Sequence, residues 1–113
     1  MVKIKRVYEQ ISPGDGKRIL VDRLWPRGIK KEDAAVDEWL KDIAPSTELR
    51  QWYSHDPEKW VGFKKRYKIE LKDRMGIIGR LRQESKKGTI TLLFSAKATE
   101  LNNAAALREF IEE

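Results

Sequence analysis

The chain of 113 residues has the size of one domain, and with 40% hydrophobic residues it can bury a core. Its 24 Lys and Arg residues outnumber its 18 Asp and Glu residues, and the formal net charge of +6 suits phosphate, nucleic acid or another polyanion as a partner. The absence of cysteine excludes disulfides, thiol nucleophiles and thiolate metal sites. No apolar run approaches the roughly 18 residues of a membrane span, and the first residues do not form a signal peptide, so we expect a cytoplasmic protein with no membrane partner.

Two strands are expected near the amino terminus. Val2–Tyr8 alternates apolar and basic residues, and Arg18–Asp22 is apolar and β-branched before it ends in a carboxylate. The turn Ser12–Gly16 separates them. This short connection is compatible with a hairpin, which would make the two strands antiparallel.

Several helices are expected between the second and third strands. A short helix over 36–43 is predicted from apolar residues at helical spacing, with Asp33 or Asp37 as its cap. Ser46 is expected to cap the next helix, and Asp56–Glu58 is a start signal for a third because an Asp cap precedes a proline and an acid. The residues that predict the first of these helices are Val36, Trp39, Leu40 and Ile43.

The region 60–88 carries one apolar stripe over a long helical stretch. Gly76 and Gly79 predict an interruption, although a single bent helix is also compatible with the pattern, and Lys86–Gly88 ends the region. The stripe consists of Trp60, Phe63, Tyr67, Leu71, Met75, Ile78 and Leu81.

The third strand is the clearest element of the sequence. Thr89–Ser95 is rich in apolar and β-branched residues, which is typical of the centre of a sheet, and a last helix opens within 98–103. The order of elements predicts a single α/β domain over residues 1–113, with a short sheet of about three strands packed against several helices. The long helical connection predicts that the third strand is parallel to one of the first two, so that the sheet is at least partly parallel.

The stretch Leu20–Gly28 holds the candidate site, on a loop at the carboxyl end of a strand, where open α/β sheets bind ligands. Arg23 and Arg27 carry planar guanidinium groups suited to an anion, Trp25 would wall the pocket, and Asp22 would orient an arginine or accept a proton as the candidate catalytic residue. The alternative is that Asp22 and Arg23 form a structural ion pair while Trp25 fills the core.

Further donors are expected from segments distant in the chain. If the third strand is parallel to the second, the start of the last helix meets the candidate loop and presents Asn102 and Asn103. Ser46 and Arg50 begin another helix that would close the cleft. For Ser46 and Asn102 individually, helix capping is the preferred interpretation. Together these residues predict a pocket for a phosphate-bearing small molecule or nucleotide, in a protein that is either a binder or an enzyme of unassigned class.

No metal or cofactor is expected. His55 is the only histidine, and it stands directly before a helix start signal. One histidine without further ligands does not make a zinc site, and no glycine-rich phosphate loop is present.

A basic belt between residues 64 and 87 offers an alternative function. Lys64, Lys65 and Lys68 would contact nucleic acid in a non-enzymatic binding module. Acidic residues are mixed into this belt, however, so that a solvated helix face is the preferred interpretation.

Four motifs resemble one protein family. Leu20–Gly28, Trp39–Arg50, His55–Pro57 with its following aromatic residues, and Glu70-Leu71 are similar to the YeaO-like group, domain-of-unknown-function family 488. The resemblance covers nearly the whole chain and implies a small single α/β domain, without implying a particular activity. The chain departs from the family pattern at Leu101, where a histidine is expected between an acid and an asparagine.

Overall fold

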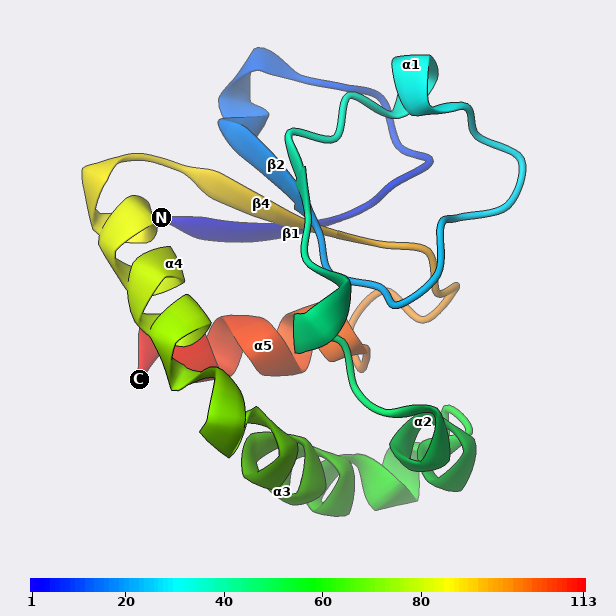
Figure 1. Ribbon diagram of the computed structural model, residues 1–113. Helices are drawn as coiled ribbons and strands as arrows, with labels where there is room; N and C mark the ends of the chain where they lie inside the picture. Colours follow the sequence, from blue (N-terminus) through cyan, green and yellow to red (C-terminus); the bar gives the residue numbers. More distant parts are fainter.

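A computed structural model describes residues 1–113, and its centre is a four-stranded sheet in which every neighbouring pair is parallel (Figure 1). The strands lie in the order β1-β4-β2-β3, so that the last strand of the chain is inserted between the first two. The strands are β1 (Val2–Arg6), β2 (Lys17–Leu20), β3 (Glu38–Trp39) and β4 (Ile90–Phe94). The predicted α/β class is confirmed, and so is the parallel orientation of the last strand, which pairs with both β1 and β2, although the sheet has one more strand than expected.

The predicted hairpin between the first two strands is wrong. β4 pairs with β1 through Val2 and Ile90 at one end of the ladder, and its other edge pairs with β2, where Leu20 lies opposite Leu93. All five residues of β4 are buried, because it is covered on both faces and paired at both edges. This wholly buried strand takes the inner position and keeps β1 and β2 apart.

The main helices lie together on one side of the sheet, whereas α1 and the loops around it lie on the other (Figure 1). No helix combines the length and the apolar character that crossing a bilayer requires. The predicted caps Ser46, Asp56 and Asn102 are confirmed, since each side chain accepts a backbone N–H at the start of its helix. The α-helices are α1 (Lys31–Ala34), α2 (Thr47–Tyr53), α3 (Trp60–Glu70), α4 (Met75–Lys87) and α5 (Asn103–Glu112), and single 3-10 turns cover Pro13–Asp15, Lys41–Ile43, Pro57–Lys59 and Leu71–Arg74.

The helix predicted over 36–43 is wrong. This segment forms the edge strand β3 and then the 3-10 turn η2 (Lys41–Ile43). Asp37 caps no helix and instead accepts a hydrogen bond from the Arg18 backbone N–H at 2.8 Å. Asp33 lies inside α1, whose N-cap is Lys30. Pairing with β2 satisfies the backbone of this short segment, and its apolar side chains are used on both sides of the sheet, so the helical spacing of those residues is a coincidence.

The predicted interruption of the long helical region is confirmed, although the two glycines do not cause it. Gly76 and Gly79 lie inside α4, and the break is the 3-10 turn Leu71–Arg74 between α3 and α4. Leu71 is buried in this turn and fixes it on the core. The chain therefore changes direction at an anchored turn.

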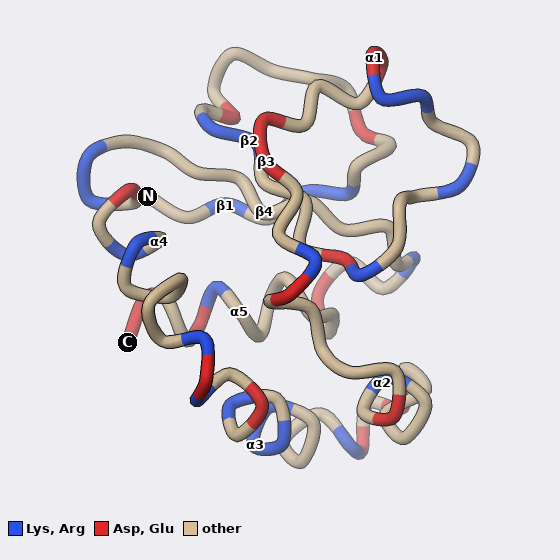
Figure 2. Tube along the Cα trace, in the orientation of Figure 1, with Lys and Arg blue, Asp and Glu red and all other residues tan.

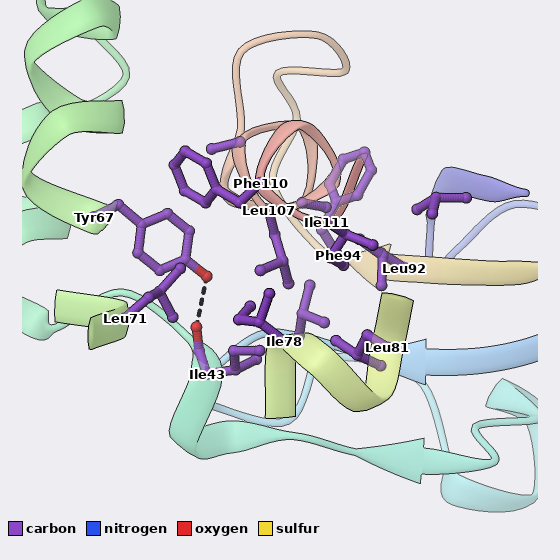
Figure 3. Packing of buried hydrophobic residues seen from close by; sticks show 14 of the residues in the cluster. Ile43, Tyr67, Leu71, Ile78, Leu81, Leu92, Phe94, Leu107, Phe110 and Ile111 are labelled. Atoms are coloured by element: carbon purple, nitrogen blue, oxygen red, sulfur yellow. Dashed lines mark hydrogen bonds between the residues drawn. The ribbon is translucent and has the colours of Figure 1, made fainter. Parts of the chain in front are cut away.

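The main core lies between the sheet and helices α2 to α5 (Figure 3). Leu92 and Phe94 of β4 point into it, as the period of two in a strand requires, whereas Leu93 packs on the opposite face. Tyr67 of α3 is fully buried there, and its hydroxyl donates a 2.5 Å hydrogen bond to the Ile43 carbonyl (Figure 3). Burial raises the pKa of Tyr67, so its hydroxyl stays protonated as a donor.

A buried charge cluster holds the turn before β2. Asp15 and Arg18 are 4% and 3% exposed, and they form an ion pair to which Lys5 adds a second cation at 3.0 Å. Burial alone would raise the pKa of Asp15, but hydrogen bonds from the Ser12 backbone, Lys5 and Arg18 outweigh it and hold this pKa below its ordinary value. Asp15 is therefore ionised in the folded protein and stabilises it above acidic pH.

Candidate functional site

The two segments expected to converge do meet at the carboxyl end of the sheet. Asp22, just after β2, accepts hydrogen bonds on Oδ2 from the Ser95 backbone N–H at 2.9 Å and from the Ser95 hydroxyl at 2.8 Å. Asn103, the first residue of α5, donates from Nδ2 to Asp22 Oδ1 and to the Val21 carbonyl, both at 3.1 Å. The Asp22 carboxylate thus links the ends of β2 and β4 to the start of α5, and it forms no ion pair with Arg23.

Trp25 and Arg27 lie on the other side of the sheet from the main helices. The Trp25 indole packs edge-on against Trp39 with 5.5 Å between ring centroids, and its Nε1–H donates to the Ile29 carbonyl at 2.8 Å. Trp25 therefore packs against a smaller apolar cluster on this face of the sheet, in line with the alternative that gave it a structural role, and this cluster consists of Val7, Leu20, Ala34 and Leu93. The Arg27 side chain is exposed, and only its carbonyl is engaged, by the Tyr8 hydroxyl at 2.7 Å.

Arg23 lines an open cavity of about 650 Å³ that we call the Arg23 cavity. It lies where the chain leaves β2 and β3, beside α2, the end of α3 and the turn that follows α3. Arg23 Nη2 donates to the carbonyls of Ala44 and Pro45 at 3.2 and 3.5 Å, while its buried Nε has no hydrogen-bond partner. The guanidinium is held in place by backbone carbonyls and its charge has no paired carboxylate.

Charges of both signs surround the Arg23 cavity without pairing. The structure contains nine ion pairs with nitrogen-to-oxygen distances of at most 4.0 Å, and none of them involves a residue that lines this cavity. Outside the cavity, neighbouring opposite charges do form ion pairs, as Lys64 does with Glu109 and Arg80 with Glu84. The lining includes three guanidinium groups, from Arg23, Arg66 and Arg74, and four carboxylates, from Asp42, Glu48, Glu70 and Asp73.

Ser46 combines the two roles that the sequence left open. Its Oγ caps α2 by accepting the Leu49 backbone N–H at 3.1 Å, and the residue also lines the Arg23 cavity. Both its backbone N–H and its hydroxyl donate to the Glu70 carboxylate, at 2.8 and 2.5 Å. The Ser46 hydroxyl thus accepts one hydrogen bond, from Leu49, and donates another, to Glu70, whose carboxylate it holds at the cavity wall.

Arg66 also lines the Arg23 cavity, although the sequence did not indicate it as a candidate site residue. Its guanidinium lies over the Trp52 indole, 3.9 Å from the ring centroid, and both residues line the Arg23 cavity. Gly62, one turn before Arg66, makes this approach possible, because a Cβ there would lie 2.9 Å from the tip of the Trp52 ring. The spacing of Gly62 and Arg66 on one helix face is the only signal in the sequence for this arrangement.

The remaining predicted donors do not line the Arg23 cavity. Asn102 is 1% exposed and serves α5, accepting from the Ala105 N–H at 2.9 Å and donating to the Ala98 carbonyl. Arg50 is exposed on α2 and forms no ion pair. The structure thus brings Arg23 and Ser46 to one cavity, joins Asn103 to Asp22, and leaves Trp25, Arg27, Arg50 and Asn102 outside the cavity.

A second, smaller cavity of about 220 Å³ lies beside the start of α5. His55, in a left-handed backbone conformation with φ of 55°, lines it together with Leu101, the position of the departure from the family pattern. The Tyr53 hydroxyl donates to the Leu101 carbonyl at 2.9 Å, and burial raises the pKa of Tyr53, with Asp56 adding to the shift. No three His, Asp or Glu side chains are grouped so that they could hold a metal ion.

The lysines of the nucleic-acid alternative lie on α3, a mostly basic helix whose one acid, Glu70, is its last residue (Figure 2). Lys64 pairs with Glu109 at 3.2 Å, and Lys68 pairs with Glu113 at 2.7 Å, both acids belonging to the carboxyl-terminal end of the chain. Lys65 is exposed and forms no ion pair. Two of the three lysines thus already have carboxylate partners.

Comparison with known proteins adds the family. The sequence model described as "Inactive DUF488-N3 subclade" matches residues 1–113. The chain is 46% identical over 110 residues to the uncharacterised protein YeaO of Escherichia coli K12, which covers 97% of this chain and 96% of that protein. It is 43% identical over 110 residues to the uncharacterised protein Rv3073c of Mycobacterium tuberculosis H37Rv, covering 97% of this chain and 92% of the relative. No solved structure matches. These matches over the whole chain show that the protein belongs to the DUF488 family of YeaO-like proteins, in the subclade described as inactive.

Proposed function

We propose that the protein binds a small phosphate-bearing molecule or nucleotide, and that the Arg23 cavity is its binding site. The observation that carries this proposal is the set of three guanidinium groups, from Arg23, Arg66 and Arg74, which line one cavity without a carboxylate partner. A guanidinium group presents a rigid fork of donors that matches phosphate oxygens, and an arginine free of ion pairs keeps those donors available.

The fixed geometry of two of these arginines supports the proposal. Arg66 is stacked on Trp52, and Arg23 is held by two backbone carbonyls, so both lose little conformational freedom when an anion binds. The volume of about 650 Å³ lies within the range of small-molecule sites, and a lone phosphate would fill only part of it.

A binding role without catalysis is favoured over an enzymatic one. The family model carries the description "inactive". Both carboxylate oxygens of Asp22, the candidate catalytic residue, accept hydrogen bonds from Ser95 or Asn103. These contacts give Asp22 a structural role, and no contact supports a role in proton transfer. The cytoplasmic location expected from the sequence remains a prediction, which cell fractionation tests.

A thermal-shift titration with nucleotides and sugar phosphates tests the proposal. Arg74 is exposed at the cavity, and its side chain bonds only to the carbonyl of Asp73, so Arg74→Gln should fold as the wild type does. A ligand at 100 times its Kd stabilises the folded state by about 2.7 kcal/mol, and Arg74→Gln should lose most of this gain. Arg27→Gln is the matched control, since Arg27 is exposed outside the cavity. Equal stabilisation of both variants by every phosphate ligand would contradict the proposal.

Nucleic-acid binding by α3 remains the alternative. It would use the exposed Lys65 together with Lys64 and Lys68, once these release Glu109 and Glu113. This alternative predicts that the affinity for nucleic acid falls steeply as the salt concentration rises. Neutralising the three lysines should abolish this affinity, whereas Arg74→Gln should leave it unchanged. A gel shift at low and moderate salt separates the two functions.

A further inference from the structure

The Arg23 cavity differs in charge from the rest of the molecule. The chain as a whole has a net charge of +6, yet the cavity lining has one more carboxylate than guanidinium. A ligand that is only an anion would therefore meet guanidinium groups and uncompensated carboxylates in the same hollow. The lining is better matched to a ligand with charges of both signs.

The carboxylates of the cavity fall into two groups. Glu70 is occupied, because it accepts both hydrogen bonds from Ser46. Asp42, Glu48 and Asp73 are exposed, and their carboxylates take part in no ion pair and accept no hydrogen bond from a protein donor. These three side chains supply acceptors that the protein itself does not use.

The arginines do not neutralise these acids, although they line the same cavity. Arg66 is committed to the Trp52 ring and Arg23 to backbone carbonyls, and neither has a carboxylate oxygen within 4.0 Å. The stack on Trp52 and the carbonyl contacts thus hold these two guanidinium groups away from the carboxylates of the cavity. A ligand that carries both a positive and a negative group could pair with both sets of charges when it enters the cavity.

We infer that the ligand is an aminated phosphate ester, whose phosphate binds the guanidinium groups while its ammonium group binds the carboxylates of Asp42, Glu48 and Asp73. This inference rests on the proposed function, because it places a second recognition element in the same cavity. An ammonium group donates three hydrogen bonds, and a carboxylate without other donors is its natural acceptor. The cavity volume of about 650 Å³ leaves room for both ends of such a molecule.

Two probes that differ by one ammonium group test the inference. Calorimetric titrations with phosphoethanolamine and with ethyl phosphate are run at one fixed ionic strength, because the charges are exposed and salt screens them. Wild-type protein should bind phosphoethanolamine about tenfold more tightly than ethyl phosphate, as a charge-assisted contact requires. The double variant Glu48→Gln/Asp73→Asn should reduce this preference to about twofold or less. Asp33→Asn, which changes an exposed acid outside the cavity, should keep the wild-type preference.

The outcomes separate this inference from the proposed function. If ethyl phosphate binds as tightly as phosphoethanolamine, and Arg74→Gln weakens both, the phosphate site stands and the ammonium site is refuted. A preference that survives in the Glu48→Gln/Asp73→Asn variant also refutes the ammonium site. If neither probe binds at millimolar concentration while nucleotides do, the aminated ligand is wrong. If no phosphate ligand binds at all, both proposals fail.

Discussion

Replacing Asp22 by alanine should destabilise the fold, because this carboxylate joins three elements at the carboxyl end of the sheet. The change leaves the Ser95 backbone N–H and one Asn103 N–H without their acceptor, while the Ser95 hydroxyl can turn to water. Each amide donor that loses a charged acceptor costs about 1.5 kcal/mol, so the variant should lose about 3 kcal/mol of unfolding free energy. For a domain of this size, that loss lowers Tm by roughly 12 °C.

The assay is urea denaturation followed by far-ultraviolet circular dichroism at neutral pH. Asp22→Asn keeps one acceptor oxygen but turns an amide donor toward the other donors, so it should cost about half as much as alanine. Asp33→Ala is the control, because Asp33 is exposed and accepts no hydrogen bond, and it should stay within about 0.5 kcal/mol of wild type. An Asp22→Ala loss below about 1 kcal/mol would refute the structural role that we assign to this carboxylate.

Three further outcomes follow from the packing. Tyr67→Phe should cost about 1–3 kcal/mol of unfolding free energy in chemical denaturation, because it leaves a buried carbonyl without a donor, and a neutral result would show that the hydrogen bond contributes nothing. Gly16→Ala should lower Tm strongly in a thermal melt, since φ is 61° and a Cβ would lie 2.1 Å from the carbonyl oxygen of Thr89, whereas Gly88→Ala, with nothing within 4 Å, should not. The lowered pKa of Asp15 predicts that its contribution to stability is fully present above the ordinary Asp pKa of about 3.9 and is lost as the pH falls through its folded-state pKa, and Asp15→Asn should flatten this acid limb in pH-dependent denaturation curves.

The parts of the fold that could be predicted from the sequence are those where the local residue types favour a single conformation. Residues 90–94 are apolar and rich in β-branched and aromatic side chains, and they form the fully buried β4. Ser46, Asp56 and Asn102 precede helices and cap them, because a short polar side chain at such a position has few competing uses. In these places the sequence and the tertiary structure demand the same conformation.

The strand order and β3 depend on contacts that the sequence does not display. The apolar residues of 36–43 fit a helical spacing, yet Trp39 packs against Trp25 across one face and donates from Nε1 to the Asp22 carbonyl. The short turn before β2 favoured a hairpin, because local geometry says nothing of a strand that arrives seventy residues later. Contacts between segments distant in the chain therefore determine both the strand β3 and the strand order.

The meeting of the two segments could be predicted from the sequence, whereas most of the residues that line the Arg23 cavity could not. Arg23 and the convergence of the loop after β2 with the start of α5 were expected from the carboxyl ends of parallel strands. Arg66 and Arg74 were not identified, since a charged helix face ordinarily faces solvent and their position beside Arg23 comes from the packing of α3 against α2. Arg27 looked equivalent to Arg23 in the sequence, but it is exposed outside the cavity and only its carbonyl is hydrogen-bonded.

The place of β4 in the sheet sets the order in which this chain can acquire its structure. Val2 lies beside Ile90, and β2 likewise finds its inner partner only in β4. During translation, β1 and β2 cannot be joined until residue 94 has left the ribosome, and a chain that stops short of it keeps only the short pairing of β2 with β3. Loop closure over almost ninety residues makes slow, all-or-none refolding the expected kinetics for so small a domain.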